Sequence, residues 1–361
     1  MRVRLPAWLA KNRSLRIGLA MLAVAVAVPQ GAALSEVLAK GPEPIAISAT
    51  PIPAFTSSAP DRRRFGRLEF RGGLQLRSPH PAFGGFSGLA RSPDGRRLTA
   101  ISDKGYWLSA DVAADASGRI VGLHRAVMGP LLSQTGRPLA STRSYDTEGL
   151  AITGQVAYVS IERTHEVLRF DWGAEGPRGP AKAVPLPKEV KALGRNKGLE
   201  SIGVAPPGSP VAGAVVTIAE EPPRAGGPDG FIVTGPVKGT FSVARRDGFA
   251  ITDMAFLPGG DLVLLERRYV PPFSLAMRLR LVDRAAIRPG AVVDGEILLT
   301  ADLAAEIDNM EGLAAHRNAA GETILTLISD DNFSMFQRTV LLEFALLPPE
   351  SASIAPSVKA R

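Results

Sequence analysis

The chain has 361 residues, which exceeds one ordinary core of about 100 to 150 residues, so it holds several domains or one large repetitive architecture. Hydrophobic residues make up 45% and charged residues 21%, values that exclude a disordered chain and a polytopic membrane protein. The 37 glycines and 30 prolines indicate many turns between short strands. The absence of cysteine excludes disulfides, zinc knuckles and thiolate nucleophiles.

The first 33 residues have the order of a secretory signal peptide. They contain basic residues and no acidic one, so the formal net charge of +7 falls close to neutrality without them. An apolar run at 17–28 and the small residues Gly31, Ala32 and Ala33 follow the basic part. We expect cleavage near Leu34 and a periplasmic or secreted protein, with an uncleaved N-terminal anchor as the alternative. A nearly neutral mature chain predicts no nucleic-acid partner, and no membrane contact beyond such an anchor.

Composition divides the remaining chain into three parts. Residues 34–61 are rich in proline and predict a tether or a loosely packed lead-in. Residues 62–348 form the folded body, and 349–361 form a C-terminal tail.

A repeat organises the body. Five segments share a short opening: FSGLARS (86–92), TEGLAIT (147–153), GLESIGV (198–204), ITDMAFL (251–257) and MEGLAAH (310–316). A turn, a second apolar run with a charged end and further short runs follow each opening. Four antiparallel strands in a unit of about 50 to 60 residues are typical of a β-propeller blade. The sequence therefore predicts an all-β propeller of five blades, with six blades or a β-sandwich array as alternatives.

The last unit lacks a fourth strand, and segment 65–76 precedes the first unit without a unit of its own. We expect this N-terminal segment to pair with the last blade and close the ring, which removes the exposed strand edges.

The repeat directs carboxylates toward one region, because inner strands line the channel of a propeller. Four acids belong to the openings, at Glu148, Glu200, Asp253 and Glu311. Seven more belong to the charged run ends, at Asp103, Glu162, Glu220, Glu221, Glu266, Asp330 and Asp331. So many carboxylates repel one another unless a cation neutralises them, and oxygen ligands favour Ca²⁺, with Mg²⁺ as the alternative. The competing interpretation is that these acids cap strands and pair with arginines.

Basic residues accompany these acids at Lys104, Arg163, Lys197, Arg267 and Arg268. Acids and bases at one rim suit an anionic substrate that is held through metal ions and guanidinium groups. Exposed salt bridges are an equally good explanation. The catalytic residues are left unassigned, with Glu148, Glu311 and Asp330 as candidates.

The runs DTEGLA (146–151), NMEGLA (309–314) and SDDNF (329–333) resemble the phytase-like family, also described as esterase-like activity of phytase. The resemblance covers about residues 70–346. It implies an exported bacterial β-propeller related to calcium-dependent propeller phytases, which hydrolyse phosphate esters.

We therefore expect a monomeric, metal-dependent hydrolase that acts on a small anionic phosphate ester at the mouth of the channel. The alternative is a non-catalytic scaffold of the cell envelope that binds a ligand or a protein on one face of the ring.

Overall fold

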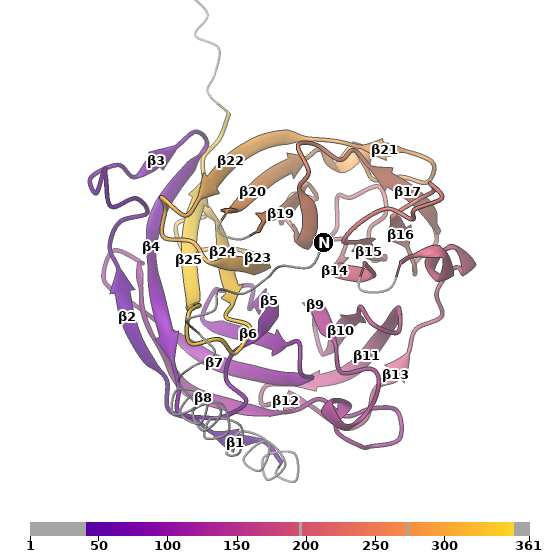
Figure 1. Cartoon of the computed structure of the whole chain (residues 1–361), viewed down its shortest axis with the longest axis horizontal. Helices are drawn as coiled ribbons and strands as arrows, with labels where there is room; N and C mark the ends of the chain where they lie inside the picture. The colour runs from indigo at the N-terminus through magenta and orange to yellow at the C-terminus, as the bar shows by residue number, and fades with distance from the viewer. Residues whose placement is uncertain (1–40, 195–196, 272–273, 350–361) are drawn as a thin grey trace, which may run out of the picture. The chain divides into compact units, whose positions relative to one another are not determined.

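The computed structural model describes residues 41–194, 197–271 and 274–349, all of which lie in one unit, Gly41–Arg361. The predicted signal peptide, residues 34–40 of the lead-in and residues 350–361 of the tail lie outside the described residues. The described chain forms a β-propeller of five blades, as predicted, with the blades arranged around a common centre (Figure 1). The alternatives of six blades and of a β-sandwich array are wrong.

Each blade is an antiparallel sheet, apart from one parallel edge strand in the third, and the strand that contains the repeated opening lies innermost (Figure 1). The first blade contains β5 (Phe86–Arg91), β6 (Arg97–Ser102), β7 (Tyr106–Ala114), β8 (Ile120–Pro130) and the edge strand β1 (Glu43–Pro44). The second contains β9 (Thr147–Thr153), β10 (Val156–Ile161) and β11 (Glu166–Gly173), with the short strands β12 (Gly176–Pro177) and β13 (Lys182–Ala183) both paired to β11.

The third blade contains β14 (Leu199–Val204), β15 (Val215–Ala219), β16 (Gly230–Ile232), β17 (Gly239–Val243) and a parallel edge strand, β21 (Val292–Val293). The fourth contains β18 (Ala250–Phe256), β19 (Leu262–Val270), β20 (Ser274–Val282) and β22 (Glu296–Asp302). The fifth contains β23 (Asn309–Arg317), β24 (Thr323–Asp330), β25 (Thr339–Leu346), β4 (Leu68–Arg77) and β2 (Ser48–Ile52), and β3 (Arg64–Phe65) pairs with β4. The described residues also form three short 3-10 helices, η2 (Leu139–Ser141), η3 (Lys188–Ala192) and η4 (Arg284–Ala286).

Segment 65–76 supplies a strand to the last blade, as predicted. It forms most of β4, which pairs antiparallel with β25 from Leu68 to Leu76. The further prediction, that this pairing closes the ring, stays a prediction that the stability experiment below tests.

The described part of the lead-in corrects the expectation of a loosely packed segment. β1 pairs with β8, and β2 pairs with β4 at the outer edge of the fifth blade. Phe55 is buried and its ring lies 5.0 to 5.7 Å from the rings of Phe65, Phe70 and Phe344. Prolines such as Pro51 are compatible with this arrangement because an edge strand needs N–H donors on one side only.

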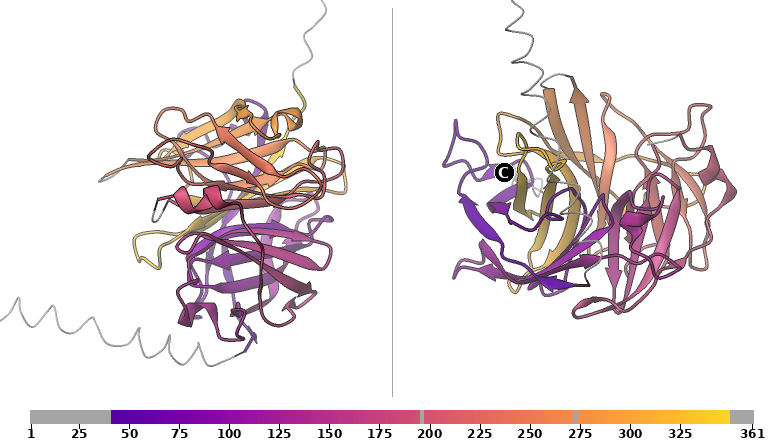
Figure 2. Two further views of the ribbon diagram at one scale, coloured as in Figure 1. Left: turned by 90° about the vertical axis from the view of Figure 1, so that its right-hand side faces the viewer. Right: turned by 60° about the horizontal axis from the view of Figure 1, so that its bottom comes forward.

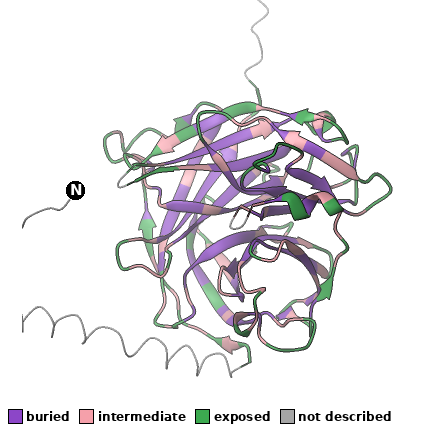
Figure 3. Cartoon of the chain, turned by 45° about the vertical axis from the view of Figure 1, so that its right-hand side comes forward, coloured by how far each residue is buried: buried purple, intermediate pink, exposed green. Residues whose placement is uncertain are grey.

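Apolar side chains fill the spaces between neighbouring blades, and the strands are buried along most of their length (Figure 3). Trp107 of the first blade, for example, packs edge-to-face on Trp172 of the second, with ring centroids 6.0 Å apart. The views in Figure 2 show the blades from the side and from below. Among residues 41–349, apart from the four that are not described, no helix has the length and apolar character needed to cross a membrane.

Candidate functional site

Every blade has an irregularity at the same place, near the start of its inner strand. The pairing of the inner strand with the second strand shifts register there in all five blades. The unpaired inner-strand residues at these β-bulges are Ser87, Glu148, Glu200, Thr252 and Glu311. Because a bulge redirects the side chain of its extra residue, each blade presents one bulge residue near the centre, and three of the five are glutamates.

The residue after each bulge is small in most blades because the inner strands approach one another closely. A Cβ atom on Gly149 would lie 2.7 Å from the Ile202 nitrogen and 2.8 Å from the Glu200 carbonyl oxygen. Glycine has no Cβ and tolerates this approach. The repeated glutamate-glycine pair thus combines a redirected carboxylate with a close contact between blades.

Asp253 lies at this glycine position, one residue after the bulge, so the expectation that it joins the other acids is wrong. Its two carboxylate oxygens accept hydrogen bonds from the backbone N–H groups of Met254 (2.8 Å) and Leu313 (2.7 Å). The carboxylate therefore links the inner strands of the fourth and fifth blades. Thr252 occupies the bulge instead, and its hydroxyl donates to the Met310 carbonyl oxygen at 3.3 Å.

The ends of the second strands provide the other acidic position. On each second strand one residue pairs with the inner-strand residue that precedes the bulge. The residue directly after it is, in the five blades in order, Asp103, Glu162, Glu220, Arg267 and Asp330. Glu266 precedes this position, and alternation along the strand directs it to the opposite face, so its predicted place at the centre is also wrong. It pairs with Arg280 inside the fourth blade, and both side chains are fully buried.

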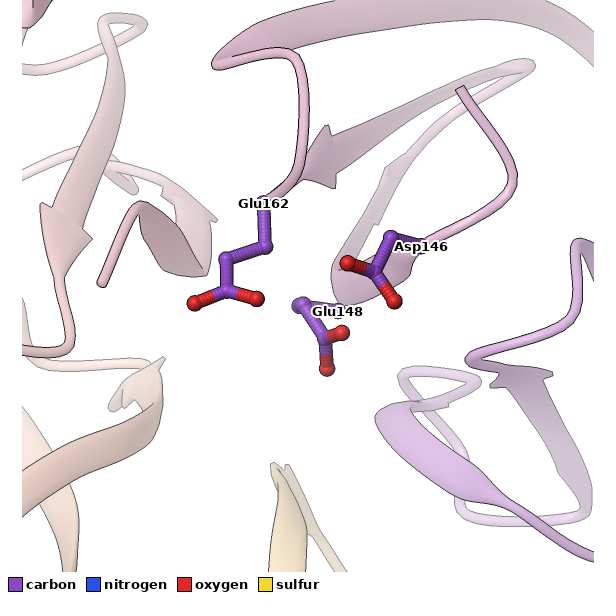
Figure 4. Close-up of side chains that lie close together, drawn as sticks. All are labelled: Asp146, Glu148 and Glu162. Carbon is purple, nitrogen blue, oxygen red and sulfur yellow. The ribbon is translucent and has the colours of Figure 1, made fainter. Parts of the chain in front are cut away.

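Eight carboxylates gather at this end of the channel, and we call them the acidic centre. They are Asp103, Asp146, Glu148, Glu162, Glu200, Glu220, Glu311 and Asp330. Carboxylate oxygens of Asp146, Glu148 and Glu162 lie within 4.8 Å of one another, and the three side chains point toward a common space (Figure 4). A second triad, Glu162, Glu200 and Glu220, meets the same limit. Glu162 belongs to both triads.

Burial and mutual repulsion raise the pKa of these carboxyl groups. Burial is the larger cause, and it raises the pKa of Asp103 and of Glu162 to about 7 and that of Asp330 to about 8. Glu311 adds repulsion at Asp103 and Asp330, while the backbone N–H of Gly198 opposes the rise at Glu162. Burial followed by repulsion from Glu311 also raises the pKa of Glu148. Full ionisation of the acidic centre is therefore unfavourable unless a bound cation balances the negative charges.

The fourth blade contributes a base where the other blades contribute an acid. The Arg267 guanidinium forms an ion pair with Glu311, lies 3.6 Å from a Glu220 oxygen and donates to the Asn309 side-chain oxygen at 2.6 Å. Asn309 in turn donates to Glu311 at 2.9 Å. Arg267 neutralises the side of the centre next to the fourth and fifth blades, whereas the two triads belong to the second and third.

Three other predicted substrate-binding bases lie at the rim of the centre. Lys197 Nζ lies 3.0 Å from Glu220 and 2.8 Å from Glu221. Lys104 Nζ lies 3.0 Å from the centroid of the Phe333 ring, and Arg163 pairs with the Tyr145 ring and hydroxyl. Arg268 does not lie at this rim, because it is two residues after Glu266 on β19 and its side chain therefore lies on the same face of the strand as that of Glu266.

Two predicted site residues hold local structure. Arg268 lies over the Phe249 ring, 4.9 Å from its centroid, and donates to the Asp247 carbonyl oxygen. Asp331 accepts hydrogen bonds from the backbone of Gly85 (3.0 Å) and Phe333 (3.0 Å) and from the Thr339 hydroxyl (2.8 Å). Asp331 thus ties the loop before β5 to the β24–β25 connection and belongs to neither triad.

The candidate ligands that the structure brings together are Asp103, Glu148, Glu162, Glu200, Glu311 and Asp330. Asp146 and Asn309 were not among the predicted site residues. Alignment of the openings could have found both, because each stands two residues before a bulge glutamate. Glu220 occupies the same run-end position as Glu162.

Comparison with known proteins gives one family. The family model described as "Phytase-like: Esterase-like activity of phytase" matches residues 81–333. Among curated proteins, none matches this sequence.

Solved structures with a similar fold include "Structure of U3-55K", at 12% identity and a TM-score of 0.36, covering 72% of this chain and 95% of that chain. "Crystal structure of RRP9 WD40 repeats" has 12% identity and a TM-score of 0.36, covering 82% of this chain and 100% of that chain. The β-propeller domain of Cps50 (Swd1) from Myceliophteria thermophila has 10% identity and a TM-score of 0.36, covering 82% of this chain and 99% of that chain.

Proposed function

The chain belongs to the Phytase-like family, and we propose that it is a metal-dependent hydrolase of small phosphate esters whose active site is the acidic centre. The observation that supports this proposal is the pair of carboxylate triads that share Glu162. The family description supports an ester as the substrate class.

The residues of the two triads fit a hard divalent cation. Every donor is a carboxylate oxygen, and closely spaced oxygens are the ligands that Ca²⁺ and Mg²⁺ prefer. Asp146, Glu148 and Glu162 would hold one such cation, and Glu162, Glu200 and Glu220 would hold a second. Charge supports the same conclusion, because the four described bases at the centre and its rim, Arg267, Lys104, Arg163 and Lys197, cannot balance eight carboxylates.

A bound cation would neutralise the phosphate and promote deprotonation of water, which is the chemistry that metal hydrolases use. In the reaction water adds to phosphorus, the bond to the leaving oxygen breaks, and that oxygen takes a proton. Arg267 is placed to hold a phosphate oxygen, with Asn309 keeping the guanidinium in position. Asp330, with its pKa raised to about 8 by burial, holds a proton near neutral pH and is our candidate proton donor.

We further propose that the protein is exported by its N-terminal segment and acts as a monomer on a small anionic ester. These parts of the proposal depend on the sequence: the signal-peptide order of the first 33 residues and the nearly neutral charge of the rest.

The test is phosphate release from a small monoester in calcium, in magnesium and in chelator. We expect release with a cation, loss in chelator, and a large fall in kcat for Glu162→Gln. The control Glu221→Gln removes a neighbouring charge that belongs to neither triad. A carboxylic ester assayed in parallel separates phosphatase from carboxylesterase activity. If cation-loaded protein cleaves neither ester, the enzyme proposal is wrong and the scaffold alternative is favoured.

A further inference from the structure

A cavity of about 620 Å³ lies beside the acidic centre, between the fourth and fifth blades. Arg267 and Asn309 line its inner wall, and both residues also contact Glu311 of the centre. The cavity and the acidic centre therefore share one guanidinium and one amide, so a ligand held at Arg267 can extend into the cavity.

The outer walls of this cavity are apolar and exposed. Tyr269 at the end of β19, Leu303 after β22 and Phe336 in the β24–β25 connection are 58%, 54% and 89% exposed. A phenylalanine exposed to this degree buries almost none of its apolar surface, and such groups gathered at one cavity mark a binding site. A cavity of this size is in the range of small-molecule sites.

The wall that contains Phe336 is joined to the acidic centre by backbone hydrogen bonds. The Asn332 N–H donates to the Asp330 carboxylate at 2.6 Å, and the Phe333 N–H donates to Asp331 at 3.0 Å. Lys104 covers the Phe333 ring from the first blade. The β24–β25 connection thus starts at Asp330 and leads from the acidic centre to the apolar wall.

The charges of the cavity select against a polyanion. Among the described residues that line it, Arg267 is the one base, and Asp308 is an acid whose oxygens accept from Gln337 and from the Arg338 N–H. Several phosphate groups would need several bases. One guanidinium next to apolar walls suits a single anionic group attached to an apolar one.

We propose that this cavity is the subsite for the leaving group, and that the substrate is an amphiphilic monoester with an aryl or short alkyl group. The identification as a leaving-group subsite rests on the proposed function. The apolar group contacts Tyr269, Leu303 and Phe336, while its anionic group lies at Arg267.

The experiment uses two probes so that binding and hydrolysis are measured separately. The fluorescence of 1-anilinonaphthalene-8-sulfonate reports binding of an anionic aromatic molecule without turnover. The ratio of kcat/KM for 1-naphthyl phosphate to that for methyl phosphate reports use of the cavity in catalysis. Phe336→Ser and Leu303→Ser are the variants. Val292→Ser, an apolar residue on β21 that is 72% exposed, is the matched control.

We expect each variant to weaken sulfonate binding and to lower the substrate ratio about tenfold, and the control to change neither. Weakened sulfonate binding in a protein that hydrolyses no ester would support the cavity as a binding site for an anionic aromatic molecule, while refuting the proposed function and with it the leaving-group role. Equal use of both esters, with sulfonate binding insensitive to the variants, would overturn the subsite and leave the proposed function standing. A third measurement is binding to vesicles of phosphatidylcholine and phosphatidylglycerol. Loss of this binding in the variants, with sulfonate binding unchanged, would assign the apolar side chains to a membrane surface and also overturn the subsite.

Discussion

Replacing Glu162 with glutamine removes the one carboxylate that both triads share. In the metal-free protein this carboxylate destabilises the fold at high pH, because burial and repulsion from Asp146 and Glu220 raise its pKa from 4.5 to about 7. The native state then holds the proton more tightly than the unfolded state does. The penalty is absent below pH 4.5, grows as the pH rises, and reaches about 3 kcal/mol above pH 7.

We therefore expect Glu162→Gln to be more stable than the wild type in chelator at pH 8, by up to about 3 kcal/mol, and equally stable at pH 4. At roughly 2 °C per kcal/mol for a domain of this size, the difference in Tm is about 6 °C. Calcium should narrow this difference at pH 8. A cation at about 100 times its Kd adds about 2.7 kcal/mol to the wild type, and the variant should gain less.

The assay is thermal unfolding of wild type, Glu162→Gln and the control Glu221→Gln, in calcium and in chelator, at both pH values. Glu221 is exposed and pairs with Lys197, so the control should resemble the wild type in its response to calcium. The metal-site reasoning fails if Glu162→Gln melts below the wild type in chelator at pH 8 and gains as much Tm from calcium as the wild type does. The Glu162 carboxylate would then stabilise the fold as a hydrogen-bond acceptor.

Four further predictions concern the scaffold. Glu266→Gln should cost about 1 to 3 kcal/mol by removing a buried carboxylate from Arg280, which keeps its ion pair with Asp294 at 2.9 Å, and it should preserve the calcium-induced gain in Tm; a lost calcium response would place Glu266 at the acidic centre. Gly149→Ala should cost about 1 to 3 kcal/mol in denaturant unfolding because of its backbone contacts, whereas Gly259→Ala, with nothing within 4 Å, should not. Burial, with a smaller contribution from Arg91, lowers the pKa of His316 to about 4, so the wild type should lose up to about 3 kcal/mol relative to His316→Gln between pH 6.5 and pH 4; parallel pH profiles would refute this. Deletion of residues 65–76 should lower the Tm of the whole propeller by removing the strand paired with β25, and an unchanged Tm would refute ring closure.

The sequence alone was enough to predict the blades. Five openings at similar spacing, each followed by a turn and another apolar run, predict repeated antiparallel sheets because hairpins form between neighbours in the chain. It was also enough to predict that segment 65–76 joins the last blade, since that segment lies outside the five repeat units and the last unit lacks a fourth strand.

The sequence pattern gave a wrong prediction for the lead-in. Its prolines indicated loose packing, but Phe55 packs on rings from β3, β4 and β25. These partners come from segments that the repeat pattern does not connect with the lead-in, so only the folded chain reveals the packing.

Whether an acidic residue belongs to the acidic centre depends on its position along the strand to within one residue. Asp253 and Glu266 are each one position away from the bulge and the run end, which Thr252 and Arg267 occupy. A shift of one residue in a strand moves a side chain to the opposite face, and the position of a bulge is not visible in composition or spacing. The chain's repeat determined that acids gather at one end of a channel, whereas the tertiary structure decided which of them meet, because the register of each bulge sets where a carboxylate points.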